Sequence, residues 1–143
     1  MNVKSILKIK GADVVTVAPD ISITQFAAVL CENRIGAAIV CDGKGSMIGM
    51  ISERDIARGL YRHGAKALEL TVSDLMTSNV HSCGPDDSII DVMAMMTDRR
   101  IRHIPVVEGD GLIGVVSIGD VVKHRIEEAE QDAEAMRQYI ATV

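Results

Sequence analysis

Two short segments of the sequence carry residue types that could hold a sugar and a phosphate. Both follow the pattern Gly-x-x-Ser-x-x-Asp, at Gly49–Asp55 and at Gly114–Asp120. Each segment is expected to join a strand to a helix, with the Ser at the N-cap and the Asp in the first helical turn. Free backbone N–H groups and the Ser hydroxyl can donate to a phosphate there, while the Asp can accept from two ribose hydroxyls. The two corners are therefore candidate ligand sites.

The same pattern also has an interpretation without a ligand. Ser-x-x-Asp at a helix start is an ordinary capping box, in which the two residues satisfy each other's backbone N–H groups. Two copies in register do not separate capping from binding. Both interpretations stay open at this point.

The composition narrows the function classes. The chain has 143 residues, 48% hydrophobic and 2% aromatic, with no Trp and a formal net charge of −5. This length suits one compact domain or two small halves with a core of aliphatic residues. An acidic chain without Trp lacks the clustered cations and stacking faces that nucleic-acid binding requires. No apolar run approaches the ~18 residues of a membrane span, so we expect no membrane partner.

Other chemistry is not indicated. Cys31, Cys41 and Cys83 lie in apolar stretches without a CxxC pair, which favours reduced, buried thiols in a cytoplasmic protein over a redox or metal role. The four histidines show no metal-ligand spacing, and no nucleophile–base pair is legible. We therefore expect no catalytic residue and no metal.

The sequence is an internal duplication. Pro19 aligns with Pro85 at an offset of 66 residues, and after one extra residue around Ser46 the offset is 65, so that Asp55 aligns with Asp120. Each copy predicts a strand, a helix, two strands and a helix. In the first copy the expected elements are Val14–Val17, Phe26–Asn33, Ala38–Cys41, Met47–Ile51 and a helix from Ser52. In the second they are Val80–Cys83, Val92–Arg99, Ile104–Val107, Leu112–Val116 and a helix from Ser117. Neither half is large enough to bury its sheet alone, so we expect a shared core.

These repeats resemble a tandem pair of CBS domains, also called a Bateman module. The resemblance rests on the repeat order, the Pro-Asp turns, the two Gly-x-x-Ser-x-x-Asp segments and the stretch Arg102–Val107, and covers Val3 to about Arg125. It implies an α+β fold of two β-α-β-β-α repeats packed around a pseudo-twofold axis, with an extended C-terminal helix. The expected boundaries are repeat 1 at 1–62, a linker at 63–71, repeat 2 at 72–126 and a helical extension at 127–143.

The resemblance further implies a function. Such pairs bind AMP, ADP, ATP, NAD-like or other adenosine compounds in two clefts between the repeats, and they regulate without catalysis. Each cleft takes Ser and Asp from one repeat and strand ends from the other. One cleft would contain Ser52, Arg54, Asp55, Asn79, Val80, Arg102 and His103. The other would contain Ser117, Asp120, Asp13, Val14, Gly36 and Ala37.

The two expected clefts differ in charge. The first combines Arg54 with Arg102 and His103, and Arg58 lies one turn along the helix from Arg54. Guanidinium groups suit phosphate, whereas the second cleft has Gly119 in place of Arg54. We expect the Ser52 cleft to bind the more phosphorylated ligand, or to bind more tightly. Arg102 and His103 could instead be a solvated strand-end pair.

The final helix predicts a partner. Its apolar residues are spaced four, three, four, three, four, as in an a/d stripe. They are Val122, Ile126, Ala129, Ala133, Met136 and Ile140. The stripe could pack on its own domain, but we expect a second subunit and hence a homodimer. As a module without an effector domain the chain would act on another protein, and the alternative function is a dimerisation scaffold without a ligand.

Overall fold

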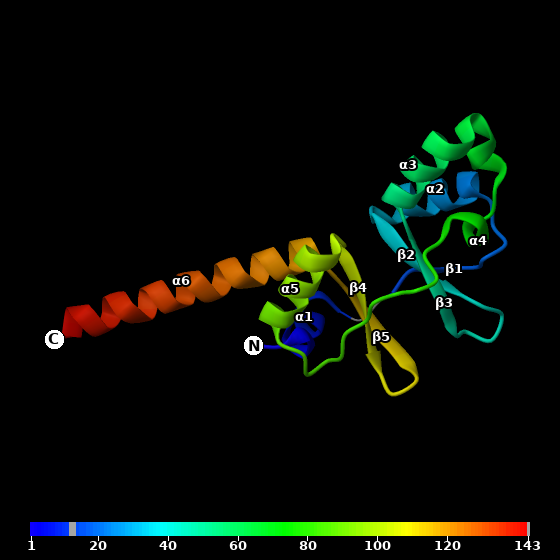
Figure 1. The fold of residues 1–143 in the computed structure, drawn as a ribbon. Coiled ribbons are helices and arrows are strands. Elements are labelled where there is room, and N and C mark those ends of the chain that lie inside the picture. Colours follow the sequence, from blue (N-terminus) through cyan, green and yellow to red (C-terminus); the bar gives the residue numbers. More distant parts are fainter. Residues whose placement is uncertain (12–13, 143) are drawn as a thin grey trace. The chain divides into compact units, whose positions relative to one another are not determined.

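The computed structural model describes residues 1–11 and 14–142, which form two compact units (Figure 1). The repeat-1 unit is Asp13–Ser82, and the repeat-2 unit combines Met1–Ala12 with Cys83–Val143. Each unit therefore contains one sequence repeat, and the N-terminal segment belongs to the unit of the second repeat. Each unit is described by itself below.

The repeat-1 unit has a three-stranded sheet in the order β1-β2-β3. Strand β1 runs parallel to β2, and β2 runs antiparallel to β3. The elements are β1 Thr16–Val17, α2 Ile23–Asn33, β2 Ala37–Cys41, β3 Met47–Ser52, α3 Glu53–His63, the 3-10 helix η1 Gly64–Glu69 and α4 Val72–Leu75. The expected order is confirmed, although β1 is shorter than the predicted strand Val14–Val17.

The repeat-2 unit contains an antiparallel hairpin of β4 and β5. Its elements are α1 Val3–Lys10, α5 Ile89–Arg99, β4 His103–Glu108, β5 Gly111–Ser117 and α6 Ile118–Thr142. The strand predicted at Val80–Cys83 is wrong, because only Cys83 of that segment bridges to Val106. Gly84 and Pro85 follow directly, and Pro has no N–H with which to continue a ladder.

Both units receive a short helix that precedes the other repeat in the chain. In the repeat-2 unit, the Val3 N–H of α1 donates to the Asp87 carbonyl at 3.0 Å. In the repeat-1 unit, the Val72 N–H of α4 donates to the Ile21 carbonyl at 2.9 Å. Val3 and Val72 are both fully buried. Each repeat is therefore completed by the segment that leads into its neighbour.

The buried apolar residues form one cluster in each unit. Phe26, Ile23 and Ile51 belong to the cluster of the repeat-1 unit, and Ile104 and Val116 belong to that of the repeat-2 unit. The clusters of the described residues thus differ from the expected shared core. The exchanged helices give the reason, because they bring apolar residues over a sheet that its own repeat could not cover.

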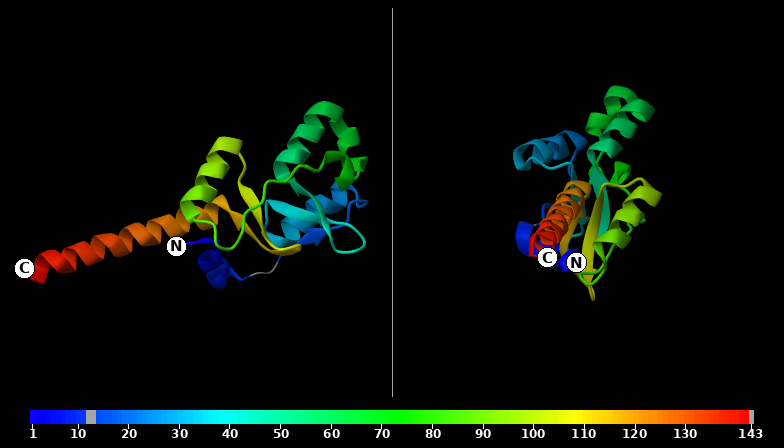
Figure 2. Two further views of the ribbon diagram at one scale, coloured as in Figure 1. Left: turned by 60° about the horizontal axis from the view of Figure 1, so that its bottom comes forward. Right: turned by 90° about the vertical axis from the view of Figure 1, so that its left-hand side faces the viewer.

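Helix α6 is the longest element, with 25 residues. Val121 and His124 are its buried residues, on the side that faces α5 and β5. Figures 1 and 2 show α6 as one unbroken helix whose C-terminal half extends away from the rest of its unit. The expected extension to about Ile140 is confirmed, and its residues from Ala129 to Thr142 are exposed.

Candidate functional site

The first Gly-x-x-Ser-x-x-Asp segment forms a strand-to-helix corner between β3 and α3. Ser52 ends β3 and is the N-cap of α3, and its N–H donates to Asp55 Oδ2 at 2.9 Å. The Ser52 hydroxyl donates to the same oxygen at 3.3 Å. Ala37 at the start of β2 is paired with Ser52, and the adjacent Gly36 carbonyl accepts from the Glu53 N–H at 2.9 Å. The corner therefore includes Gly36 and Ala37 of the same repeat.

The carboxyl group of Asp55 is unusually enclosed. Asp55 is only 8% exposed. Burial raises the pKa of this carboxyl, although the hydrogen bonds from Ser52 and the charge of Arg58 act in the opposite direction. Arg58 Nη1 lies 3.5 Å from Asp55 Oδ1. The site thus holds a carboxylate beside a guanidinium group whose side chain is 61% exposed and so within reach of a ligand.

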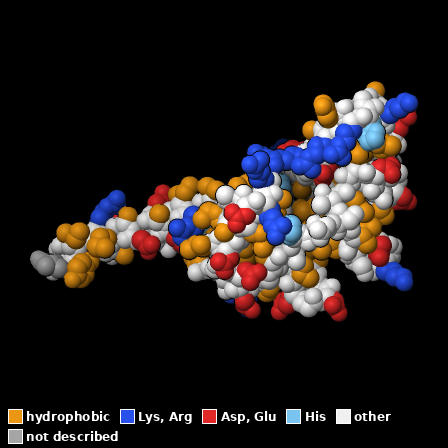
Figure 3. All heavy atoms as spheres, in the orientation of Figure 1, with side chains coloured by type: hydrophobic (Ala, Val, Ile, Leu, Met, Phe, Trp, Pro, Cys, Tyr) orange, Lys and Arg blue, Asp and Glu red, His pale blue; other side chains and the backbone are white. Residues whose placement is uncertain are grey.

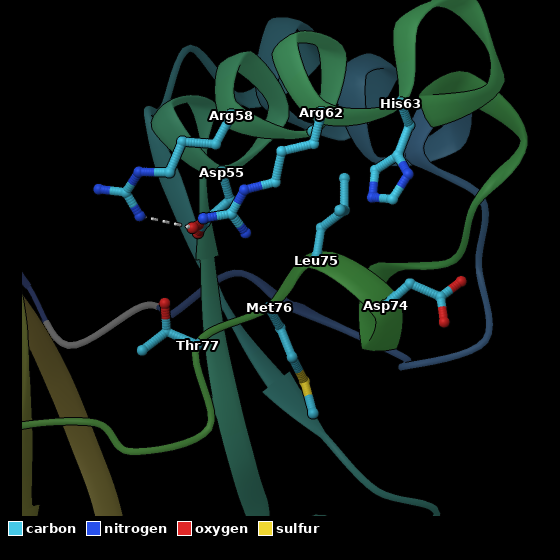
Figure 4. A pocket seen from close by; sticks show the side chains of 9 residues that line it. Asp55, Arg58, Arg62, His63, Asp74, Leu75, Met76 and Thr77 are labelled. Atoms are coloured by element: carbon cyan, nitrogen blue, oxygen red, sulfur yellow. Dashed lines mark hydrogen bonds and ion pairs between the residues drawn. The ribbon is translucent and has the colours of Figure 1, made fainter.

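A hollow of about 230 Å³ opens beside this corner, within the repeat-1 unit (Figure 4). Its polar wall combines Asp55 with Arg58, Arg62 and His63, all from α3. The opposite wall comes from α4 and the segment that follows it. The lining residues there are Asp74, Leu75, Met76 and Thr77. A carboxylate for hydroxyl groups and cations for an anion thus lie around one hollow.

Arg62, His63 and Thr77 were not predicted from the sequence to belong to the site. The signal for Arg62 was present, because Arg54, Arg58 and Arg62 follow one another at four-residue spacing on one helix face. In Figure 3, Lys and Arg side chains gather in a band over α3. Thr77 had no sequence signal. It joins the corner because its N–H and carbonyl bond to the Met50 carbonyl and N–H, each at 2.9 Å.

The second segment forms the equivalent corner between β5 and α6. The Ser117 N–H donates to Asp120 Oδ2 at 2.9 Å, and the Asp120 N–H donates back to the Ser117 hydroxyl at 3.2 Å. The side chain of Asp120 is 23% exposed. Both segments are therefore real capping boxes. Capping uses the backbone N–H of the Ser and one oxygen of the Asp carboxylate. The binding interpretation therefore stays open.

Lys10 brings a cation to the second corner that was not predicted from the sequence. Its ammonium donates to Asp120 Oδ2 at 2.7 Å and to the Val115 carbonyl at 2.8 Å. Burial tends to raise the pKa of Asp120, but the hydrogen bonds and charge of Lys10 and the Ser117 N–H outweigh it, so the pKa is lowered. Lys10 lies 110 positions from Asp120. Only the folding of α1 onto the second repeat brings the two together.

The structure places Arg102 and His103 beside Ser117. His103 is the first residue of β4 and is paired with Ser117, while the Arg102 carbonyl accepts from the Ile118 N–H at 2.8 Å. Both belong to the repeat-2 unit, whereas Ser52 and Asp55 belong to the repeat-1 unit. Their predicted role beside Ser52 joins residues of different units and stays a prediction.

The remaining predicted residues lie in the repeat-1 unit. Arg54 is exposed in the first turn of α3. Asn79 is exposed and Val80 half-buried in the segment after α4, and Val14 is half-buried just before β1. Asp13 lies outside the described residues. The predicted grouping of Val14 with Ser117 also joins different units and stays a prediction.

The two motif glycines have a packing role. A Cβ at Gly49 would lie 2.8 Å from both Met76 Sδ and the Thr77 carbonyl oxygen. A Cβ at Gly114 would lie 2.7 Å from Leu7 Cδ2. At both positions the segment leading into the other repeat lies directly on the strand. Glycine therefore allows the exchanged segment to approach beside the Ser-x-x-Asp corner.

The chain belongs to the CBS-domain family. The family model for the CBS domain matches it twice, at residues 3–62 and 72–127. The protein ATU1752 from Agrobacterium tumefaciens has a similar crystal structure, with 44% identity, a TM-score of 0.85, and coverage of 87% of this chain and 92% of that one. The expected fold, with two CBS repeats and a C-terminal helix, is confirmed.

Two further proteins are similar to this chain. The mitochondrial CBS domain-containing protein CBSX3 of Arabidopsis thaliana is 34% identical over 115 residues, which cover 78% of this chain and 56% of that protein. This chain thus spans little more than half the length of the plant relative. The CBS domain pair of protein MJ0100 was crystallised with 5-methylthioadenosine and S-adenosyl-L-methionine. That pair is 27% identical, with a TM-score of 0.78 and coverage of 90% of this chain and 98% of its own.

Across residues 1–11 and 14–142, the structure contains no helix with the length and apolar character needed to cross a membrane.

Proposed function

We propose that this CBS-domain protein binds an adenine nucleotide at its Ser-x-x-Asp corners and acts as a regulatory module without catalytic activity. The observation that carries the proposal is the same in both repeats. A partly buried carboxylate lies at the start of a helix with a cationic side chain beside it, namely Asp55 with Arg58 and Asp120 with Lys10. A carboxylate can accept from ribose hydroxyls, and the cation and helix N-terminus favour phosphate.

The residues of the site and one relative together support the chemical class of the proposed ligand. The adenosine moiety is supported by the CBS pair of MJ0100, which was crystallised with two adenosine-containing compounds. Phosphate is supported by Arg58 and Arg62, which line the hollow beside Asp55. The proposed ligands are therefore AMP, ADP, ATP or an NAD-like compound.

The proposed asymmetry between the corners rests on their cations. Arg58, Arg62 and His63 line one hollow with Asp55, whereas Lys10 is the cation paired with Asp120. Guanidinium groups donate bidentate hydrogen bonds to phosphate, and an ammonium acts as a point charge. The Asp55 corner is therefore proposed to bind the more phosphorylated ligand.

Regulation requires a second protein. A ligand shifts a conformational equilibrium only if it binds two conformations with different affinity. We propose that the chain works in the cytoplasm as a homodimer and transmits ligand occupancy to a target protein. The competing function is a dimerisation scaffold without a ligand, which is favoured by the observation that both Ser–Asp pairs cap their helices.

A thermal-shift screen of adenosine-containing metabolites, led by AMP and NAD, tests the proposal. A ligand at 100 times its Kd stabilises the folded state by about 2.7 kcal/mol, and this raises the midpoint by roughly 5–10 °C for a chain of this size. Adenosine and inorganic phosphate serve as controls for the two halves of the ligand. If no adenine nucleotide raises the midpoint, the scaffold function is the one that remains. Turnover of ATP or NAD by the pure protein would contradict the absence of catalysis.

A further inference from the structure

Helix α6 presents an exposed apolar stripe that is turned away from the buried side of the helix. Val121 and His124 face the core of the repeat-2 unit and are buried. Val122, Ile126 and Ala129 lie on a different side of the helix, because at about 100° per residue they are roughly 80–140° around the axis from Val121 and roughly 140–160° from His124. Val122 is 46% exposed and Ile126 54%. The stripe therefore does not pack on its own unit.

The stripe continues to the end of the described helix. Met136 is 59% exposed and Ile140 66%. In Figure 3, hydrophobic side chains follow the extended part of α6. With Ile126, Ala133 and Ile140 as heptad position a, the d positions are Val122, Ala129 and Met136. This is the 3.5-residue repeat of a coiled coil, and α6 is one helix over all six positions.

Charges beside the stripe select one partner and one orientation. In a parallel, in-register pair, each g residue faces the e residue five positions later on the other helix. Here Arg125 at g would face Glu130 at e of the second copy, and Asp132 at g would face Arg137 at e. Both pairs are attractive and occur twice by symmetry. Arg125 and Arg137 already pair with Glu128 and Glu134 of their own helix, at 3.0 and 3.3 Å.

An antiparallel pair that overlaps the same stripe has the opposite charge pattern. There e residues face e residues and g residues face g residues, so Glu130 would face Glu130 and Asp132 would face Asp132. Like charges at such positions weaken association. The self-complementary pattern of the parallel pair is what a second copy of this chain provides.

We infer that α6 forms a parallel, in-register, two-stranded coiled coil with α6 of a second copy, through Val122 to Ile140. The inference rests on the proposed homodimer and adds the surface that forms it. With about 1.5 Å per residue, the paired segment is roughly 27 Å long. The pairing fixes the positions of the two α6 helix starts in the dimer. Each helix start lies next to the Ser117–Asp120 corner of its own repeat-2 unit.

Sedimentation equilibrium of the full chain tests the charge pattern. Glu130→Arg places an arginine against Arg125 in both symmetry-related pairs, so the dimer dissociation constant should rise roughly tenfold. Glu127→Arg is the matched control, because Glu127 occupies the outward b position one turn away and makes the same charge change. The double variant Arg125→Glu with Glu130→Arg should restore dimerisation. Circular dichroism confirms that each variant keeps its helix.

Cross-linking tests the orientation. Ile126→Cys, in a chain with Cys31→Ser and Cys41→Ser, should form an intermolecular disulfide under mild oxidation, whereas Glu127→Cys at position b should not. Cys83 is 5% exposed and remains in place. A dimer that is equally sensitive to Glu130→Arg and Glu127→Arg, or that fails to cross-link at position 126, overturns the coiled coil and leaves a homodimer through another surface. A monomeric full chain overturns both the coiled coil and the proposed homodimer, while nucleotide binding is measured separately by the thermal-shift screen.

Discussion

The ammonium group of Lys10 lies 2.7 Å from Asp120 Oδ2, so the last residue of α1 pairs with the first turn of α6. The same ammonium donates a hydrogen bond to the Val115 carbonyl of β5 at 2.8 Å. The N-terminal helix thus contacts the carboxylate that we propose for ribose binding. A ligand that uses Asp120 must share the carboxylate with Lys10 or draw Lys10 toward its own phosphate.

Replacement of Lys10 should therefore change both the acidity of Asp120 and the ligand preference of its corner. Lys10→Met removes the donor that lowers the pKa of Asp120, so that pKa should rise in a carbon-detected NMR titration of the carboxyl group. The free energy of unfolding should fall by less than about 1 kcal/mol, since the pair is partly solvated. Lys8→Met, on the same helix and exposed, is the control. An unchanged Asp120 pKa would mean that the ion pair is not maintained in solution.

Ligand binding at the two corners should respond differently to acid. Burial raises the pKa of Asp55 and Lys10 helps to lower that of Asp120, both from an ordinary value of 3.8. Ribose binding needs the ionised carboxylate, so on acidification the Asp55 corner should lose affinity at a higher pH than the Asp120 corner. Calorimetry measures ligand affinity across pH. The variant Asp120→Ala reports the Asp55 corner alone, and Asp55→Ala reports the Asp120 corner alone. The reverse order of the two losses would contradict the assigned environments.

The same pKa directions set opposite contributions to folding. The folded-state pKa of Asp55 is raised, so its contribution to stability is present below its unfolded pKa and is lost as pH rises through the folded value. The folded-state pKa of Asp120 is lowered, so its contribution is present above the unfolded pKa and is lost as pH falls through the folded value. Urea unfolding of Asp55→Asn and Asp120→Asn between neutral and acid pH measures both.

Removal of either motif carboxylate should affect binding beyond its effect on the helix cap. Asp55→Ala and Asp120→Ala each lose the capping-box hydrogen bond from the Ser N–H, worth about 1 kcal/mol, and each should also abolish nucleotide binding at its own corner. Gln25→Ala is the matched control, because Gln25 Oε1 accepts from the Ser22 N–H at 2.9 Å in the capping box of α2. If all three variants bind nucleotide alike, the Ser-x-x-Asp pairs are caps only.

The asymmetry between corners predicts a specific effect of Arg58. Arg58→Gln removes a guanidinium from the hollow beside Asp55, so AMP affinity there should fall by roughly tenfold, as expected for one charge-assisted hydrogen bond. Adenosine affinity should change little, because the nucleoside has no phosphate. Lys44→Gln, which removes an exposed positive charge of the same unit outside the hollow, is the control. Equal losses for AMP and adenosine would indicate that Arg58 acts through Asp55 and not through phosphate.

The motif glycines should show a graded effect on stability. Gly49→Ala places a Cβ against the Thr77 backbone oxygen, and Gly114→Ala places one against the end of the Leu7 side chain. Overpacking costs about 1–3 kcal/mol, and Gly49→Ala should lie at the upper end because backbone moves less easily than a leucine methyl. Gly43→Ala, with nothing within 4 Å, should be nearly neutral. Chemical denaturation ranks the three, and a larger loss at Gly114 than at Gly49 would contradict this packing argument.

The sequence by itself determined the duplication, the order of elements in the first repeat, the CBS family and the two Ser–Asp corners. These features depend on local spacing and on register between the copies, which are legible along one chain. It also determined the apolar heptads of α6 and their flanking charges. In the first repeat, the elements from β1 to α3 follow from such local patterns, except that β1 is shorter than predicted.

Only the tertiary structure decided what surrounds the corners. Lys10 reaches Asp120, and Thr77 reaches Met50, because each lead-in segment folds onto the repeat that it does not precede. A contact between residues 110 positions apart has no signature in periodicity or propensity. The burial that raises the pKa of Asp55, and the position of Val121 and His124 that turns the stripe of α6 away from its own unit, likewise depend on packing and not on spacing.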